Sequence, residues 1–105
     1  MDLYLLFHNS NEELHYSPYV DDQRPMKNIF HGTFAFLQDL HISARLLDQV
    51  DEIGGLSIRN YVKKTSERVA YAMRIISKKA LLTKEGQQLL SGFDQALSDL
   101  QKMLS

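Results

Sequence analysis

Several residue types that carry chemistry are scarce in this sequence. Its 105 residues include no cysteine and no tryptophan, and only two prolines. Without cysteine the chain can form neither disulfides nor thiolate metal sites, and thiol catalysis is excluded. No apolar run approaches the roughly 20 residues that span a bilayer. The run LYLLF at residues 3–7 is too short for the core of a signal peptide. We therefore expect a soluble, cytoplasmic protein.

Recognisable catalytic and metal-binding patterns are also missing. No two of the four histidines are four residues apart, the spacing that places two imidazoles on one helical face. The glycine pair Gly54–Gly55 lacks the following Lys-Ser/Thr of a phosphate-binding loop. No serine lies in a strand-turn-helix nucleophile context. We expect a protein that is not an enzyme and that binds no cofactor or metal.

The remaining composition is typical of an ordinary globular protein. Hydrophobic residues make up 44% of the chain and charged residues 24%. The length indicates one domain, which we divide into an N-terminal part, residues 1–25, and a helical bundle, residues 26–105. Both prolines, Pro18 and Pro25, fall in the first part, which also holds the polar cluster HNSNEE. Two short apolar stretches flank this cluster, so the N-terminal part is either a short β-hairpin or an extended arm lying over the helices.

From Met26 onward the apolar spacing predicts three helices. The first should end at the glycine pair Gly54–Gly55, because glycine favours the cap conformation after a helix. Ser57 would then cap a second helix that runs to about Leu82, and Thr83 would cap a third. So short a link between the first two predicts an antiparallel helical hairpin. The predicted fold class is mainly α, a three-helix bundle with an N-terminal arm or hairpin.

The first helix has a wider apolar arc than one packed face requires. At about 26 residues, each of the first two helices would also be roughly 40 Å long at 1.5 Å per residue. Helices of that length protrude from a compact domain of this size unless a partner covers them. These features favour a homodimer or a hetero-complex, and we predict a homodimer. The predicted self-association residues are Phe36, Leu40, Leu47 and Val50.

Charge is distributed unevenly along the chain although the net charge is only −1. Eight of the twelve basic side chains lie between Arg59 and Lys84, with Glu67 as the single acidic residue there. On a helical wheel these cations spread over most of the side that does not carry the core stripe. A helix that reads a nucleic-acid groove concentrates its contacts along one ridge, so the spread favours a different role.

A second pattern occurs on the same helix. Its members alternate three and four residues apart, the repeat of a helix-helix seam, and they include tyrosine and arginine, which are enriched at interfaces. The predicted partner-binding residues are Tyr61, Lys64, Arg68, Tyr71, Ile75, Lys78 and Leu82. Either another protein covers this seam, or the third helix or the N-terminal arm covers it within one chain.

These patterns predict a small regulatory or adaptor protein that acts by protein-protein contact. It would inhibit or escort a larger partner, for example by occupying the surface through which a transcription factor dimerises. The alternative hypothesis is a dimeric nucleic-acid-binding protein that uses the basic helix at residues 57–82.

Overall fold

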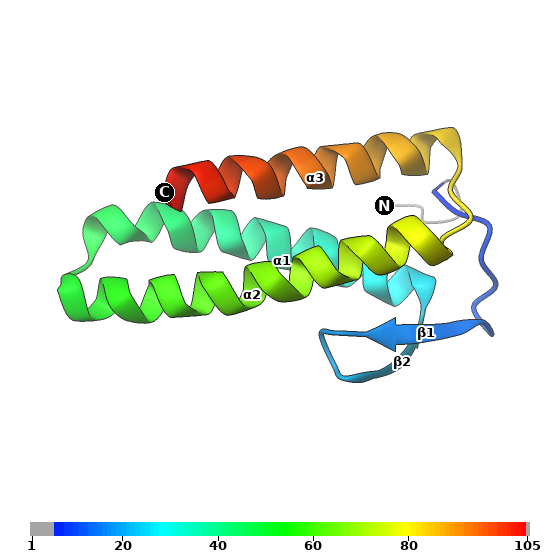
Figure 1. Cartoon of the computed structure of the whole chain (residues 1–105), viewed down its shortest axis with the longest axis horizontal. Helices are drawn as coiled ribbons and strands as arrows, with labels where there is room; N and C mark the ends of the chain where they lie inside the picture. Colours follow the sequence, from blue (N-terminus) through cyan, green and yellow to red (C-terminus); the bar gives the residue numbers. More distant parts are fainter. Residues whose placement is uncertain (1–5, 105) are drawn as a thin grey trace.

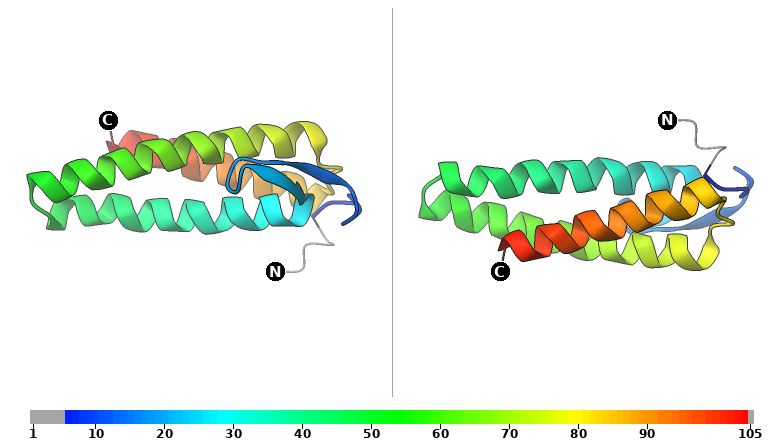
Figure 2. Two further views of the ribbon diagram at one scale, coloured as in Figure 1. Left: turned by 90° about the horizontal axis from the view of Figure 1, so that it is seen from below. Right: turned by 90° about the horizontal axis from the view of Figure 1, so that it is seen from above.

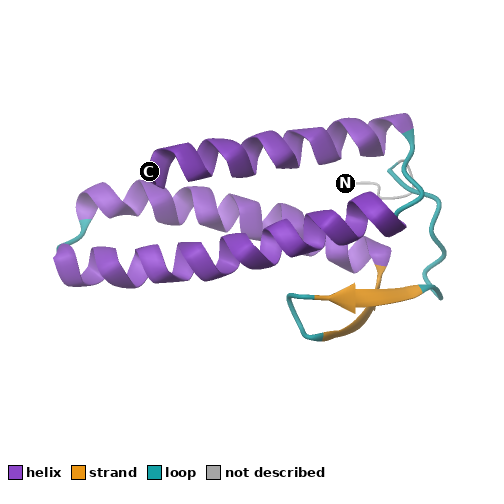
Figure 3. Ribbon diagram, viewed as in Figure 1, coloured by secondary structure: helices purple, strands orange, loops and turns teal. Residues whose placement is uncertain are grey.

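The computed structural model describes residues 6–104, so residues 1–5 of the predicted arm and Ser105 lie outside the described part (Figure 1). The chain is mainly helical, as predicted, and its N-terminal part contains a β-hairpin (Figure 3). The predicted turn was wrong, because the hairpin turns at residues 18–21 and the polar cluster HNSNEE precedes its first strand. In chain order the elements are β1 (Leu14–Ser17), β2 (Asp22–Pro25), α1 (Met26–Leu46), the 3-10 turn η2 (Leu47–Gln49), α2 (Glu52–Lys79) and α3 (Lys84–Leu104). The strands β1 and β2 pair antiparallel.

The three helices form an elongated bundle of 46 × 27 × 21 Å. The helices α1 and α2 make the predicted antiparallel hairpin, and α3 lies on one of its faces, antiparallel to α2 (Figures 1 and 2). The β-hairpin lies on the opposite face, beside the second half of α2 (Figure 2, left). The end of the α1–α2 hairpin extends past the C-terminal end of α3 (Figure 1), so α3 leaves this end uncovered.

The core lies between the three helices and is closed at one end by the N-terminal segment. Phe30 is buried near this end, stacked on Phe7 at a ring distance of 5.1 Å and tilted against Phe93 at 6.4 Å. One side of α2 carries a core stripe, of which the half-buried Ile58 is also a member. The buried members of this stripe are Val62, Thr65, Val69, Ala72, Met73 and Ile76.

The predicted boundary between the first two helices is wrong. The helix α1 ends at Leu46, and Gly54–Gly55 lies in the first turn of α2 instead of ending the helix before it. Asp51, not Ser57, caps α2: its Oδ1 accepts a hydrogen bond of 2.8 Å from the Gly54 N–H. Neither glycine has a positive φ, so neither uses the freedom that suggested a helix end. A carboxylate at the N-terminus satisfies free backbone N–H groups and the helix dipole.

The cap predicted for the third helix is correct. The Thr83 Oγ1 accepts a hydrogen bond of 3.0 Å from the Gly86 N–H in the first turn of α3. The preceding helix α2 ends at Lys79, three residues before the predicted end near Leu82. Residues 80–83 are therefore a short link between α2 and α3.

The N-terminal segment is tied to this link by backbone hydrogen bonds. The Thr83 N–H donates to the Leu6 carbonyl and the His8 N–H donates to the Leu81 carbonyl, both at 2.9 Å. The buried Asn9 side chain donates to the Lys79 carbonyl at 2.9 Å and accepts from the Leu81 N–H at 2.7 Å. These bonds hold residues 6–9 against the end of the bundle where β1 starts.

The turn between β1 and β2 packs against α1 through Tyr19. Its ring stacks on Phe36 at 4.9 Å, and its hydroxyl shares a hydrogen bond of 2.7 Å with Thr33 Oγ1. Burial raises the pKa of Tyr19 to about 12. A side chain at Gly32 would meet this ring at 2.8 Å, so glycine is needed there to let the β-hairpin lie close to α1.

Candidate protein-binding surface

The seam predicted on α2 divides into an exposed part and a covered part. Lys64, Arg68 and Lys78 are exposed, and so are much of Tyr61 and Tyr71. Ile75 is half-buried and packs against the core. Leu82 lies beyond α2, in the link that pairs with Phe7. We call Tyr61, Lys64, Arg68, Tyr71, Ile75 and Lys78 the α2 outer face.

Tyr61 connects the α2 outer face to α1. Its hydroxyl donates a hydrogen bond to the carboxylate of Asp39, and this bond raises the pKa of Tyr61 above its ordinary value. The ring is still 40% exposed. The side chain is thus held at its hydroxyl while part of the residue remains accessible for contact.

Tyr71 connects the same surface to the β-hairpin. Its ring meets Tyr16 of β1 edge to face at 5.8 Å, and the Arg74 guanidinium lies 5.5 Å from its centre. The Tyr16 hydroxyl donates to Asp21 at 2.7 Å, and this hydrogen bond raises the pKa of Tyr16. Arg68 lies within electrostatic range of the hydroxyls of both Tyr16 and Tyr61. The strand β1 therefore borders this half of α2. Contact with the N-terminal part of the same chain is one of the arrangements that the sequence left open for this seam.

None of the basic side chains on α2 is neutralised by an ion pair within residues 6–104. The ion pair found there joins Asp22 to Arg24 at 3.1 Å. A Glu13 carboxylate oxygen also lies 2.9 Å from His15 Nε2, a contact that is an ion pair only when the imidazole is protonated. The seven unpaired cations of α2 are Arg59, Lys63, Lys64, Arg68, Arg74, Lys78 and Lys79. The uneven charge of the sequence thus becomes a predominantly positive helix surface, with Glu67 as the single acidic residue between Arg59 and Lys79.

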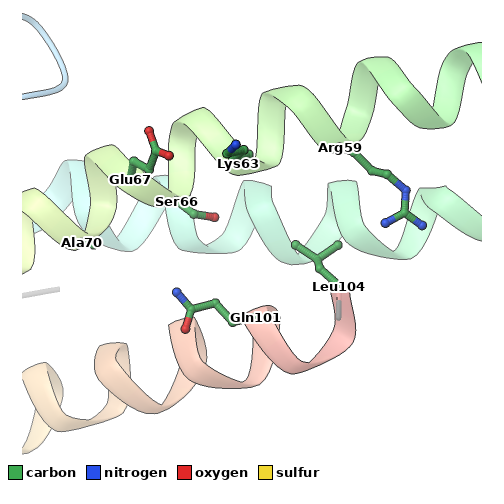
Figure 4. Close-up of a pocket in the computed structure, with 7 residues that line it drawn as sticks. All are labelled: Arg59, Lys63, Ser66, Glu67, Ala70, Gln101 and Leu104. Carbon is green, nitrogen blue, oxygen red and sulfur yellow. The ribbon is translucent and has the colours of Figure 1, made fainter.

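Five of these seven cations line two clefts beside α2, whereas Lys64 and Arg68 line neither of the two. The α2–α3 groove, of about 520 Å³, opens where α3 ends, and Figure 4 shows Arg59 and Lys63 on its α2 wall facing Gln101 and Leu104 of α3. Ser66 and Ala70 leave room at its floor. On the other side, the β1–α2 cleft holds about 580 Å³. It is lined by Glu13, Leu14, His15, Tyr16, Gln23, Tyr71, Arg74, Ile75, Lys78 and Lys79.

The predicted self-association residues are only partly accessible. Leu40 has no exposed surface because it lies in the core between the helices, so it cannot reach a partner in this fold. Phe36 lies under Tyr19, and Leu47 is half-buried. Val50 alone of the four is exposed, at 40%. The apolar arc of the first helix is wide because one side faces the other helices and another faces the β-hairpin.

An exposed apolar cluster does occur at the end of the α1–α2 hairpin. Ile53 is 83% exposed and Leu56 62%, both on the first turns of α2. We call this cluster the hairpin tip. It consists of Ile42, Leu46, Val50, Ile53 and Leu56. The sequence did not indicate this cluster, because the predicted start of the second helix at Ser57 would leave Ile53 and Leu56 outside α2.

Two features are absent from the part of the chain that the structure describes: a cluster of metal ligands and a membrane-spanning helix. The His, Asp and Glu side chains of this part form no group of three that could hold a metal ion. None of its helices has both the length and the apolar character needed to cross a bilayer. The chain matches no model of a known protein family and no curated protein sequence. The features that stand out are surfaces: the α2 outer face, the two clefts beside it and the hairpin tip.

Proposed function

We propose that this chain is a small non-enzymatic regulatory or adaptor protein that binds another protein through the α2 outer face. The observation that supports this most is the positive surface of α2, whose cations lack ion-pair partners and alternate with the exposed rings of Tyr61 and Tyr71. Tyrosine and arginine are the residues most enriched where proteins meet. Binding there would inhibit or escort the partner by covering one of its own interfaces.

The placement of the cations favours a protein over a nucleic acid. Arg59 and Lys63 line the α2–α3 groove, whereas Lys78 and Lys79 line the β1–α2 cleft on the other side of the helix. A helix that enters the major groove presents its contacts along one ridge. The net charge of −1 also gives a polyanion little long-range attraction.

The proposal is tested by charge reversal on the α2 outer face. A tagged chain is used to capture partners from the native cell, and the captured protein is then purified for direct binding measurements. We expect Lys64→Glu/Arg68→Glu to weaken this binding at least tenfold. The matched control, Lys27→Glu/Lys84→Glu, makes the same change in net charge at exposed sites outside α2 and should bind as the wild type does. Equal weakening by both pairs, or by neither, would contradict the proposal.

The nucleic-acid alternative is tested separately with a shift assay on random duplex DNA. Phosphate contacts produce binding at low salt that falls steeply as salt rises. We expect no shift even at low salt. A salt-dependent shift that Lys64→Glu/Arg68→Glu abolishes would instead favour the nucleic-acid function.

We also propose that the chain self-associates, with the hairpin tip as the contact. Five apolar side chains gathered at the uncovered end of the bundle support this, because exposed apolar clusters mark interaction sites. Light scattering at high micromolar concentration should give the mass of a dimer. Ile53→Glu should give the mass of a monomer with unchanged helicity. A wild-type monomer under these conditions would contradict self-association without affecting partner binding through α2.

A further inference from the structure

The β1–α2 cleft combines cations of α2 with apolar and aromatic side chains from both of its walls. One wall is strand β1, and the other is the second half of α2, which lies alongside it (Figure 1). The cleft contains about 580 Å³ of space open to solvent. Residues 6–9 and their hydrogen bonds to the α2–α3 link fix the start of β1 relative to α2. The cleft is therefore part of the fold and not a gap beside a free arm.

The α2 wall of the cleft is positively charged. Arg74, Lys78 and Lys79 line it, and none of them forms an ion pair with a described residue. The one acidic side chain of the cleft, Glu13, is 2.9 Å from His15 and also accepts a hydrogen bond from Asn9. The three cations on α2 therefore outnumber the single carboxylate of the cleft, which leaves positive charge for the carboxylates of a bound molecule.

The same cleft also offers apolar and aromatic surface. Leu14 is half-exposed at the β1 wall, and Tyr16 and Tyr71 meet edge to face across the cleft. Arg74 lies over the Tyr71 ring, which holds the guanidinium in place before anything binds. A small inorganic anion would contact the cations and leave this apolar surface exposed. A segment with both carboxylates and a large apolar side chain would cover both.

We propose that the β1–α2 cleft binds an acidic segment of the protein partner, in which an aliphatic or aromatic residue is flanked by Asp or Glu. This inference rests on the proposed function and specifies the chemistry of the partner. Complementary charge speeds association and selects the partner, while the apolar contact slows dissociation. Both parts of the segment are needed, so removing either one should weaken binding measurably.

Fluorescence anisotropy with a designed peptide tests this proposal. The probe is a fluorescein-labelled peptide with a central Phe-Leu pair flanked by four acidic residues on each side, and the full-length chain is titrated into it. We expect saturable binding at moderate salt. Replacing Phe-Leu with Ser-Ser in the probe should weaken binding at least fivefold, and millimolar inorganic phosphate should not displace the Phe-Leu probe. Equal binding of the two peptides, or displacement by phosphate, would show an anion site only and would overturn the proposal.

Two charge-neutralising variants locate the site. Arg74→Gln/Lys78→Gln removes two cations from the cleft, and we expect at least a tenfold loss of peptide affinity. Arg59→Gln/Lys63→Gln removes two cations from the α2–α3 groove on the same helix and should change the affinity less than twofold. Equal losses would mean nonspecific attraction and would refute the cleft as the site, as would the absence of peptide binding at low salt.

The failure of this inference can be told apart from failure of the proposed function. If the purified partner binds Arg74→Gln/Lys78→Gln as well as the wild type but loses affinity for Lys64→Glu/Arg68→Glu, the α2 outer face remains the binding site and the cleft is excluded. If the partner is insensitive to both variants, the proposed function fails as well. The side chains changed in these two variants are all exposed, so we expect folding to be unaffected. Thermal unfolding of each variant checks this.

Discussion

The N-terminal segment approaches α3 closely at Gly86, so the free energy of unfolding should depend strongly on this glycine. An added Cβ at Gly86 would overlap the carbonyl oxygen of Leu6 and lie 2.9 Å from its carbon. Both atoms belong to the Leu6 backbone, so no side-chain rotation can relieve the overlap. By contrast, Gly92 in the same helix has nothing within 4 Å of the corresponding position. Gly86→Ala and Gly92→Ala therefore form a matched pair.

The expected difference can be worked from the contacts. Alanine is favoured over glycine inside a helix by up to about 1 kcal/mol, and this gain should appear in full for Gly92→Ala. In Gly86→Ala the Leu6 backbone must move, which breaks the hydrogen bond from Thr83, a loss of about 1 kcal/mol. Displacing the buried Phe7 next to it costs about 2–3 kcal/mol more. The free energy of unfolding should fall by about 2–3 kcal/mol in net terms.

Thermal unfolding followed by circular dichroism measures both variants. For a domain of this size 1 kcal/mol corresponds to roughly 4–8 °C in Tm. Gly86→Ala should therefore melt about 10 °C or more below the wild type, and Gly92→Ala a few degrees above it. If Gly86→Ala were as stable as Gly92→Ala, residues 6–9 could not be packed against α3 as described, and the start of β1 would not be fixed.

Three further predictions concern the cap of α2, the Asn9 side chain and the buried tyrosine. Asp51→Ala should lower the free energy of unfolding by about 0.5–2 kcal/mol in urea titrations, whereas Ser57→Ala should leave it unchanged or slightly raised, because Asp51 caps the helix and Ser57 lies within it. Asn9→Ala should cost about 2–4 kcal/mol in the same assay, since it leaves one carbonyl and one N–H of the α2–α3 link without their partner. The pKa of Tyr19 is raised from 10.0 to about 12 in the folded chain, so the unfolded chain ionises first and stability should fall between pH 10 and 12 by up to about 2–3 kcal/mol. Tyr19→Phe should remove that part of the decline, and identical pH dependence in the two proteins would exclude the burial.

The sequence predicted the elements whose signals are periodic. The core stripe of α2 follows the helical repeat over many turns, and the Thr83 cap lies directly before the third apolar face. These features depend on residues close in sequence, so local reasoning was sufficient. The boundary between α1 and α2 has no such periodic signal, because Gly54–Gly55 fits both the end of one helix and the first turn of the next. Asp51 was the available signal: an acidic residue is unfavourable at a helix C-terminus and favourable as an N-cap.

The surfaces were harder to predict because they depend on contacts between distant segments. The position of Leu40 in the core follows from how α1 packs against two other helices. The β1–α2 cleft exists only because residues 6–9 pair with the link some 70 positions later. Neither Tyr16 nor Leu14 carries a local signal that would place it beside Tyr71. The seam spacing on α2 did identify Tyr61 and Tyr71, the two rings that remain exposed.

Site-specific photocrosslinking in the native cell tests most directly whether the chain acts by protein contact through the α2 outer face. A photoreactive phenylalanine analogue replaces Tyr71 in one variant and Lys64 in a second, and replaces the exposed Ser91 of α3 in a control. Irradiation should link the Tyr71 and Lys64 variants to the same protein and should leave the Ser91 control unlinked. If the two α2 positions give no crosslinked protein, or if Ser91 captures the same protein equally well, the α2 outer face is not the binding surface.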